Sequence, residues 1–274
     1  MWEVFSRRPF LGSFESGDFD FTLITSHIVY RSPDDAEEMA GILEPSFGVS
    51  DYRELGAGVT GVTKDNYARL AEMKIIMEIM ERLRAESKEK DVIFLGDTNL
   101  ESSNDQWANI LNSFPGSELF IDEPTTLSMQ LELSDGTRTN GLANDYDHII
   151  MDTKETDECL KSNGKLSPRV GNFLEGRTKR MIQSRYLYRR PGTTQKNPTA
   201  ESKRQQMVQA YRDRLEHRYT IKYNRVVVDE HRLEELVREF DERVFLSQLE
   251  EDNFYRFYKE VISDHLPVYF SCRR

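Results

Sequence analysis

The sequence predicts an α/β fold, in which helices alternate with the strands of a mixed sheet. Apolar and β-branched runs at residues 18–30, 91–96, 145–151 and 266–271 indicate strands. Between the first two, apolar side chains recur every three or four residues from Asn66 to Lys88, which indicates an amphipathic helix. Alternation of these two patterns along the chain favours helices packed on a sheet.

The expected elements follow one another with recognisable boundaries. Thr63 is the expected N-cap of the helix at 66–88. Residues 33–62 contain two prolines and several glycines, which predicts a loop. A second helical pattern runs from Leu233 to Leu249, whereas residues 160–228 show no steady period. Residues 56–61 of this loop, GAGVTG, match the G-x-G-x-x-G motif of dinucleotide-binding proteins. That motif normally follows a strand, and no strand is expected before residue 56, so we expect a simple loop.

Composition points to a protein with a packed core. The 274 residues are 38% hydrophobic, and no apolar run approaches the roughly 18 residues of a membrane span, so no membrane contact is expected. The N-terminal residues lack the apolar stretch of a signal peptide. The two cysteines, Cys159 and Cys272, are too few for a disulfide scaffold, so they are expected to be inert, which slightly favours the cytoplasm.

Charge is distributed unevenly along the chain. Residues 161–225 contain 17 basic and 4 acidic residues, a net charge of +13, whereas the rest carries 20 basic and 44 acidic residues, a net charge of −24. Arginine and tyrosine interleave in this basic segment, a composition suited to phosphate contact and base stacking. The segment is therefore either a nucleic-acid contact or a solvated insertion.

Small polar clusters stand at one end of each expected strand. Strand ends are rigid positions next to variable loops, where functional sites assemble. A single Asp there is commonly a turn residue and a single His commonly a core residue, but four clusters together favour a site. The clusters are Ser26 with His27, Asp97 with Asn99, Asp145 with Asp147, and Asp264 with His265.

Three short motifs resemble one superfamily. GDTNL at 96–100, YDHI at 146–149 and SDHLPV at 263–268 are similar to the G-D-x-N, Y-D-x-I and S-D-H-x-P motifs of the endonuclease/exonuclease/phosphatase superfamily, and they occur in the same order. RRPF at 7–10 and TLITSHIVY at 22–30 resemble segments of its DNase I branch. The resemblance implies a DNase I-like four-layer α/β/β/α sandwich with mixed sheets, formed by residues 1–274 as a single domain with a basic insertion at 160–230.

The resemblance also implies a reaction, the hydrolysis of phosphodiesters assisted by Mg²⁺ or Mn²⁺. Asp97 would then orient or deprotonate water and contact the metal, and Asn99 would hold Asp97 and a phosphate oxygen. His265 would contact the phosphate with Asp147 fixing its tautomer, and Asp264 would bind the metal. His27 would be the second histidine or the general acid, and Arg8 would contact the phosphate.

One departure from the family pattern concerns the N-terminus. In the superfamily, strands that carry a metal-site Asn and a metal-binding Glu precede the segment that residues 5–31 resemble. Here that segment starts close to Met1, so we expect an N-terminally truncated domain with exposed strand edges and apolar faces. A missing N-terminal segment or a protein partner would complete the sheet.

These observations lead to one main expectation and two alternatives. The main expectation is a metal-dependent endonuclease that acts on nucleic acid, with DNA favoured over RNA by the DNase I-like segments. The first alternative is a catalytically inactive remnant that binds nucleic acid or a protein through the basic segment. The second is a phosphatase of the same superfamily.

Overall fold

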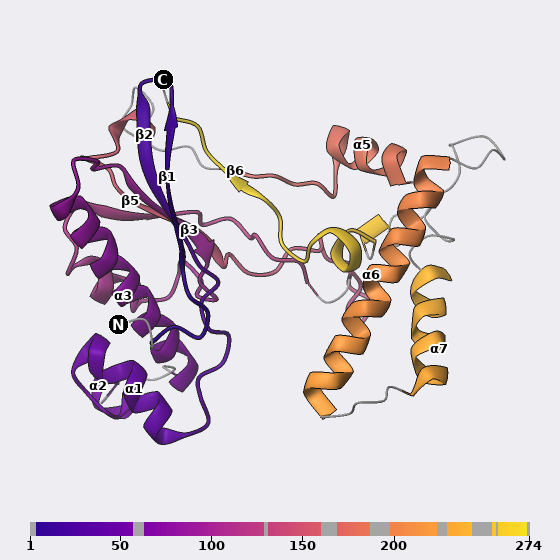
Figure 1. The fold of residues 1–274 in the computed structure, drawn as a ribbon, viewed down its shortest axis with the longest axis horizontal. Coiled ribbons are helices and arrows are strands. Elements are labelled where there is room, and N and C mark those ends of the chain that lie inside the picture. The colour runs from indigo at the N-terminus through magenta and orange to yellow at the C-terminus, as the bar shows by residue number, and fades with distance from the viewer. Residues whose placement is uncertain are drawn as a thin grey trace. The chain divides into compact units, whose positions relative to one another are not determined.

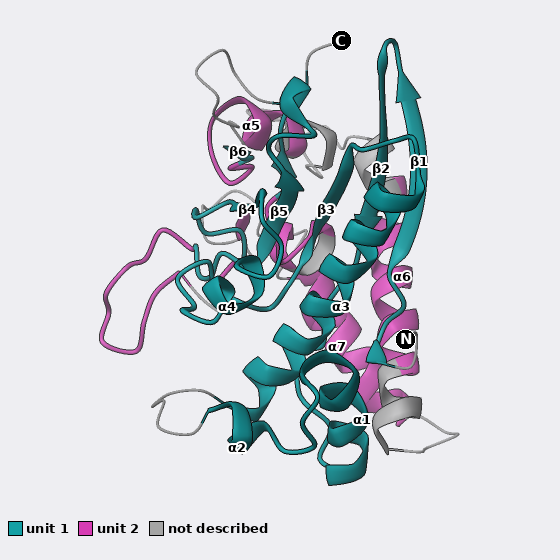
Figure 2. Cartoon of the chain, turned by 90° about the vertical axis from the view of Figure 1, so that its left-hand side faces the viewer, with its two compact units in different colours: residues 1–126, 142–171, 267–274 teal, residues 127–141, 172–266 magenta. Residues whose placement is uncertain are grey.

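The chain forms two compact units in the computed structural model, which describes residues 4–56, 63–128, 131–159, 169–186, 198–223, 229–242, 254–255 and 257–272 (Figure 1). Unit 1 comprises residues 1–126, 142–171 and 267–274, and unit 2 comprises residues 127–141 and 172–266 (Figure 2). Each unit has apolar clusters of its own. The dinucleotide-like sequence lies mostly outside the described residues.

A mixed five-stranded sheet organises unit 1, which confirms the predicted α/β class. Its order is β1-β2-β3-β5-β4. The pair β2–β3 is parallel, and the other neighbouring pairs are antiparallel. The strands are β1 (Phe10–Ser16), β2 (Phe19–Thr25), β3 (Val92–Asp97), β4 (Ser117–Phe120) and β5 (Asp147–Asp152).

The long helix α3 (Lys64–Glu86) packs against one face of this sheet (Figure 1). Its expected N-cap is confirmed, because the Thr63 hydroxyl accepts a hydrogen bond from the Asn66 backbone N–H at 3.2 Å. Met73, Met77 and Met80 are fully buried against the sheet-side core. Burial of this apolar stripe explains why the periodicity predicted the helix correctly.

The prediction of a loop at 33–62 is wrong for its first part. Residues Ala36–Phe47 form α1 and Tyr52–Leu55 form α2. The Asp35 carboxylate caps α1 by accepting the Glu37 and Glu38 backbone N–H groups. Burial of Met39, Ile42 and Leu43 in the core shared with α3 offsets the cost of Pro45 inside α1.

The opposite face of the sheet is covered in part by a two-stranded ribbon, β6 (Arg169–Val170) and β7 (Val268–Tyr269). The strand predicted at 266–271 is therefore only two residues long. Cys272 follows it and forms a disulfide with Cys159, the last residue of a 3₁₀ turn at Asp157–Cys159. The expectation of two inert thiols is wrong, because the fold brings together cysteines 113 residues apart in sequence. The slight preference for the cytoplasm rested on unpaired cysteines, so it loses its basis.

The outer strand β1 exposes apolar side chains. Phe10, Leu11 and Phe14 are all exposed although they lie in a strand. Phe14 stacks on Phe21 of β2, with ring centroids 5.4 Å apart. An exposed edge and apolar surface were expected from the sequence, and completion of the sheet by a partner stays a prediction.

Much of the basic segment is helical. Unit 2 contains α5 (Gly176–Tyr186), α6 (Pro198–Tyr223) and α7 (Glu230–Asp241). The first part of the helical pattern predicted at 233–249 lies in α7, and residues 243–249 lie outside the described residues. The Tyr211 ring stacks on Phe240 at 3.9 Å between centroids. Arg212 of α6 pairs with Glu230 and Glu234 of α7. Because α6 is held by these long-range contacts rather than by a continuous apolar stripe, periodicity missed it.

No helix among the described residues is long and apolar enough to cross a membrane.

Asp91, immediately before β3, gives the fold a pH dependence. Burial, with the nearby carboxylates Glu158 and Glu89 adding to it, raises the pKa of Asp91 to about 7 from an ordinary value of 3.8. The folded state therefore keeps this proton where the unfolded chain has lost it, so stability should fall as pH rises from about 4 to about 7. Asp91→Asn should remove this loss, and urea unfolding at about pH 5 and about pH 8 measures it.

The matched control is Asp105→Asn, which makes the same change at an exposed aspartate. This variant should keep the pH dependence of the unmodified protein. An Asp91→Asn protein whose stability still changed with pH as the parent's does would contradict the assignment.

Candidate functional site

Two carboxylates face each other where β3 ends and β5 begins. Asp97 is the last residue of β3, Asp147 is the first of β5, and the two are paired across the antiparallel strands. Directly opposed residues of an antiparallel pair have side chains on the same face. The Asp97 side chain is only 12% exposed. The sheet thus brings together two predicted site residues 50 positions apart in sequence.

His27 joins this pair from β2. The segment after β2 continues alongside β3, and the Ile28 N–H donates to the Asp97 carbonyl oxygen at 2.8 Å. This places His27 Nε2 3.5 Å from Asp97 Oδ2. The His27 side chain is 49% exposed, so one end of the pair faces solvent. A histidine beside a carboxylate at a solvent-exposed edge is suited to proton transfer.

Gly96 makes this approach possible. A Cβ atom at Gly96 would collide with the Ser26 carbonyl oxygen. Without a side chain at Gly96, the backbone before His27 can lie directly against the end of β3. The glycine of the GDTNL motif is therefore a packing requirement for the His27–Asp97 pair.

Asn99 holds the loop that follows. Its backbone has a positive φ of 52°, a left-handed conformation that Asn tolerates better than most residues. Its N–H donates to Asp97 Oδ1 at 2.9 Å, and its side-chain amide donates to the Ile28 carbonyl at 2.8 Å. Asn99 thus fixes both the Asp97 carboxylate and the segment that carries His27.

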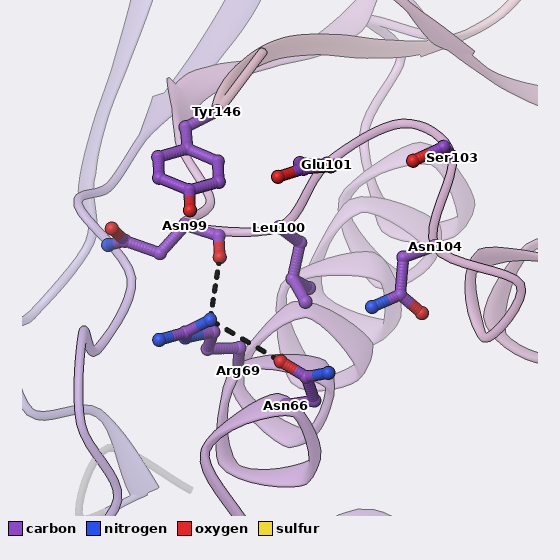
Figure 3. A pocket seen from close by; sticks show the side chains of 8 residues that line it. All are labelled: Asn66, Arg69, Asn99, Leu100, Glu101, Ser103, Asn104 and Tyr146. Carbon is purple, nitrogen blue, oxygen red and sulfur yellow. Dashed lines mark hydrogen bonds between the residues drawn. The ribbon is translucent and has the colours of Figure 1, made fainter. Parts of the chain in front are cut away.

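A cavity of about 260 Å³ adjoins Asn99 (Figure 3). In Figure 3, side chains from α3, from the loop after β3 and from the residue before β5 surround one space. Most of the lining groups are polar. The lining residues are Asn66, Arg69, Asn99, Leu100, Glu101, Ser103, Asn104 and Tyr146.

Arg69 is a residue that the sequence analysis missed. Its Nη1 donates to the Asn99 carbonyl at 2.9 Å, and its Nη2 donates to the Tyr30 carbonyl. It therefore ties α3 to the loops on both sides of the site. A polar residue within an amphipathic helix carries no sequence signal for this role, since periodicity reports only the buried face.

Tyr146 connects the cavity to the carboxylates. Burial raises the pKa of Tyr146, and the Glu101 carboxylate adds to the effect, as does the Asp97 carboxylate to a smaller extent. The phenol therefore keeps its proton at neutral pH and is available as a hydrogen-bond donor. Tyr146 belongs to the YDHI motif, which could have pointed to it.

Two further residues of this region support the loop instead of lining the site. The Asp145 carboxylate accepts hydrogen bonds from the backbone and hydroxyl of Ser102. His148 is fully buried, with Nδ1 3.1 Å from the Ile121 carbonyl oxygen and Nε2 2.8 Å from that of Leu100. The contacts of Asp145 with Ser102 and of His148 with Leu100 hold the loop after β3 against the sheet.

The other predicted site residues are placed differently. Asp264 and His265 belong to unit 2, where the Asp264 carbonyl accepts the Leu127 N–H at 2.9 Å and the His265 N–H donates to the Ser263 hydroxyl at 3.0 Å. Arg8 is exposed before β1. Unit 1 therefore brings together His27, Asp97, Asn99 and Asp147, whereas Asp264 and His265 belong to the other unit and Arg8 lies in the exposed segment before β1.

The cluster offers two carboxylates as ligands for a hard divalent ion such as Mg²⁺. No group of three or more potential metal ligands occurs in the part of the chain that the structure describes. Mg²⁺ is commonly bound by one or two carboxylates and completes its shell with water and substrate phosphate. Asp97 and Asp147 meet this smaller requirement, and they are the residues of unit 1 that would hold it.

Comparison with models of protein families and with curated proteins gives no match for this chain. The family assignment therefore stays a resemblance carried by the motifs.

Gly96→Ala tests the packing requirement at the end of β3. The added methyl group would push the Ser26–His27 segment away from Asp97, so we expect a loss of about 1–3 kcal/mol in the free energy of unfolding. Urea unfolding gives this value, and the histidine NMR signals report on the surroundings of His27.

Gly41→Ala in α1 is the matched control. A Cβ at Gly41 meets nothing within 4 Å, so this variant should be unchanged or stabilised by about 0.5–1 kcal/mol. Equal effects of the two substitutions would show that the close approach at Gly96 has no energetic consequence.

Proposed function

We propose that this protein is a metal-dependent phosphodiesterase of the DNase I-like type that acts on nucleic acid. The observation that carries the proposal is the cluster of His27, Asp97, Asn99 and Asp147 at one edge of the sheet of unit 1. These residues come from three segments of the sequence, and they match the motif positions whose chemistry implied hydrolysis. The DNase I-like sandwich is part of the same proposal.

In this proposal one side chain activates the attacking water and another protonates the leaving oxygen. Asp97 accepts the proton of the attacking water or orients that water, and Asn99 keeps the carboxylate in position through its N–H. His27, half exposed beside Asp97, gives a proton to the leaving oxygen. The ends of adjacent strands hold Asp97 and His27 side by side, which positions both groups for proton transfer in the same site.

Asp97 and Asp147 would hold Mg²⁺ or Mn²⁺. When bound, such an ion neutralises charge on the phosphate. By the motif resemblance, Asp264 and His265 of SDHLPV stay predicted metal and phosphate contacts, and Arg8 stays a predicted phosphate contact. The basic helices α5 and α6 would bind the phosphates of the nucleic acid outside the site.

One observation favours the alternative of a nucleic-acid-binding protein without hydrolysis. The described residues contain no group of three metal-ligating side chains, so metal binding in this proposal depends on the two carboxylates of Asp97 and Asp147. The two readings differ in one measurable property, the dependence of strand cleavage on the Asp97–His27 pair. A superfamily phosphatase would instead release phosphate from monoesters.

A supercoiled-plasmid nicking assay with millimolar Mg²⁺ or Mn²⁺ decides between them. The unmodified chain should nick the plasmid, EDTA should stop the reaction, and Asp97→Asn should lower the rate by about 10²-fold or more. His265→Ala should also lower it if the SDHLPV motif contributes the phosphate contact. Asp20→Asn, an exposed aspartate on β2, makes the same charge change outside the cluster and should leave nicking unaffected.

A folded Asp97→Asn protein that nicked at the parental rate would contradict the assignment of Asp97. Absence of nicking by the unmodified chain, together with plasmid binding in a gel-shift assay, would establish the non-hydrolytic alternative.

A further inference from the structure

The cavity beside Asn99 offers hydrogen-bonding groups that the protein itself does not use. Arg69 Nε is buried and has no hydrogen-bond partner. The Asn66 amide uses its oxygen to accept from Arg69, and the Asn104 amide uses its oxygen to accept the Gln106 N–H. Their two amide nitrogens make no hydrogen bond to the described residues. The Asn66 and Asn104 amides line one space, so their N–H groups are available to a ligand there.

The cavity shares a wall with the proposed reaction site. Asn99 lines the cavity and donates its N–H to Asp97. Tyr146 lines it from the β5 side, directly before Asp147, the residue that is paired with Asp97 across the two strands. A group bound in the cavity would therefore adjoin a phosphate held at Asp97.

The composition of the walls excludes a bare phosphate as the best ligand. Glu101 would repel an anion, and phosphate without a metal ion is bound best by cationic and N–H donors. Arginine and amide donors, carboxylate and amide acceptors and an aromatic ring together match the edge and face of a heterocyclic base. The volume of about 260 Å³ lies just below the range of roughly 300–1,000 Å³ for drug-sized ligands, which suits one nucleoside.

We propose that this cavity binds the nucleoside next to the scissile phosphate, with its base against Tyr146 and between Arg69 and Glu101. This inference rests on the proposed function, because it names the substrate class of the same site. A nucleoside pocket makes nucleic acid the preferred substrate over other phosphodiesters such as those of lipids. It also favours unpaired or flipped nucleotides, since the base must leave its stack to enter a cavity.

Isothermal titration calorimetry in EDTA tests the cavity without metal or reaction. The four nucleoside 5′-monophosphates and ribose 5-phosphate are titrated into the full chain. At least one nucleotide should bind about tenfold or more tightly than ribose 5-phosphate, because only the nucleotides carry a base that can stack on the ring. Equal affinities, or no detectable binding of any nucleotide at millimolar concentration, would overturn the proposal.

Two variants locate the binding. Ser103→Trp fills the cavity from an exposed position whose side chain makes no hydrogen bond among the described residues, and Tyr146→Leu removes the ring. Both should abolish the preference for nucleotides over ribose 5-phosphate. Ser113→Trp, an exposed serine that does not line the cavity, should bind like the parent. A preference that survived in both cavity variants would place the base elsewhere and overturn the proposal.

Failure of this inference is separable from failure of the proposed function. Plasmid nicking without a nucleotide preference in the calorimeter would remove the nucleoside pocket and leave the hydrolase. A nucleotide preference that is lost in the cavity variants, in a chain that does not nick DNA, would remove the hydrolase and leave a nucleoside-binding pocket.

Discussion

The parallel contact between the end of β2 and the end of β3 is the constraint on which the site depends. Because Gly96 lacks a side chain, the Ser26–His27 backbone lies against β3, and the Ile28 N–H bonds to the Asp97 carbonyl. The same contact sets the position of His27 beside Asp97, and Asn99 reinforces it by donating to the Ile28 carbonyl. Gly96, Asp97 and Asn99 of the GDTNL motif thus all help to hold the segment that carries His27 against the end of β3.

Helix α3 connects the core of unit 1 to this contact. Its apolar face is buried under the sheet, and its polar residues reach the loops around the site. Glu72, also on α3, is fully buried and accepts the Ser6 and Val29 N–H groups at 3.0 and 3.2 Å. Burial raises the pKa of Glu72, and the two hydrogen bonds act in the opposite direction, because they stabilise the charged carboxylate. Core packing and site geometry therefore depend on the same helix.

The two units differ in charge, since unit 1 carries 17 basic and 30 acidic residues and unit 2 carries 20 basic and 18 acidic residues. Unit 1 carries the carboxylates of the proposed site, whereas the basic segment supplies the helices α5 and α6 of unit 2. Acidic residues at a phosphodiesterase site repel a polyanionic substrate, and basic residues elsewhere in the chain can supply the attraction that binding needs.

Local patterns determined the α/β class, α3 with its Thr63 cap, the strands β2, β3 and β5 and the polar clusters at their ends, because periodicity and capping depend on neighbouring residues. They did not predict β1 or β4. Tertiary structure decided the rest. The helix α1 forms despite Pro45 because its apolar face is buried with α3, and the Cys159–Cys272 disulfide joins distant segments. The cavity beside Asn99 combines a helix, a loop and the residue before β5. These features arise from long-range contacts, which the sequence of a single segment does not specify.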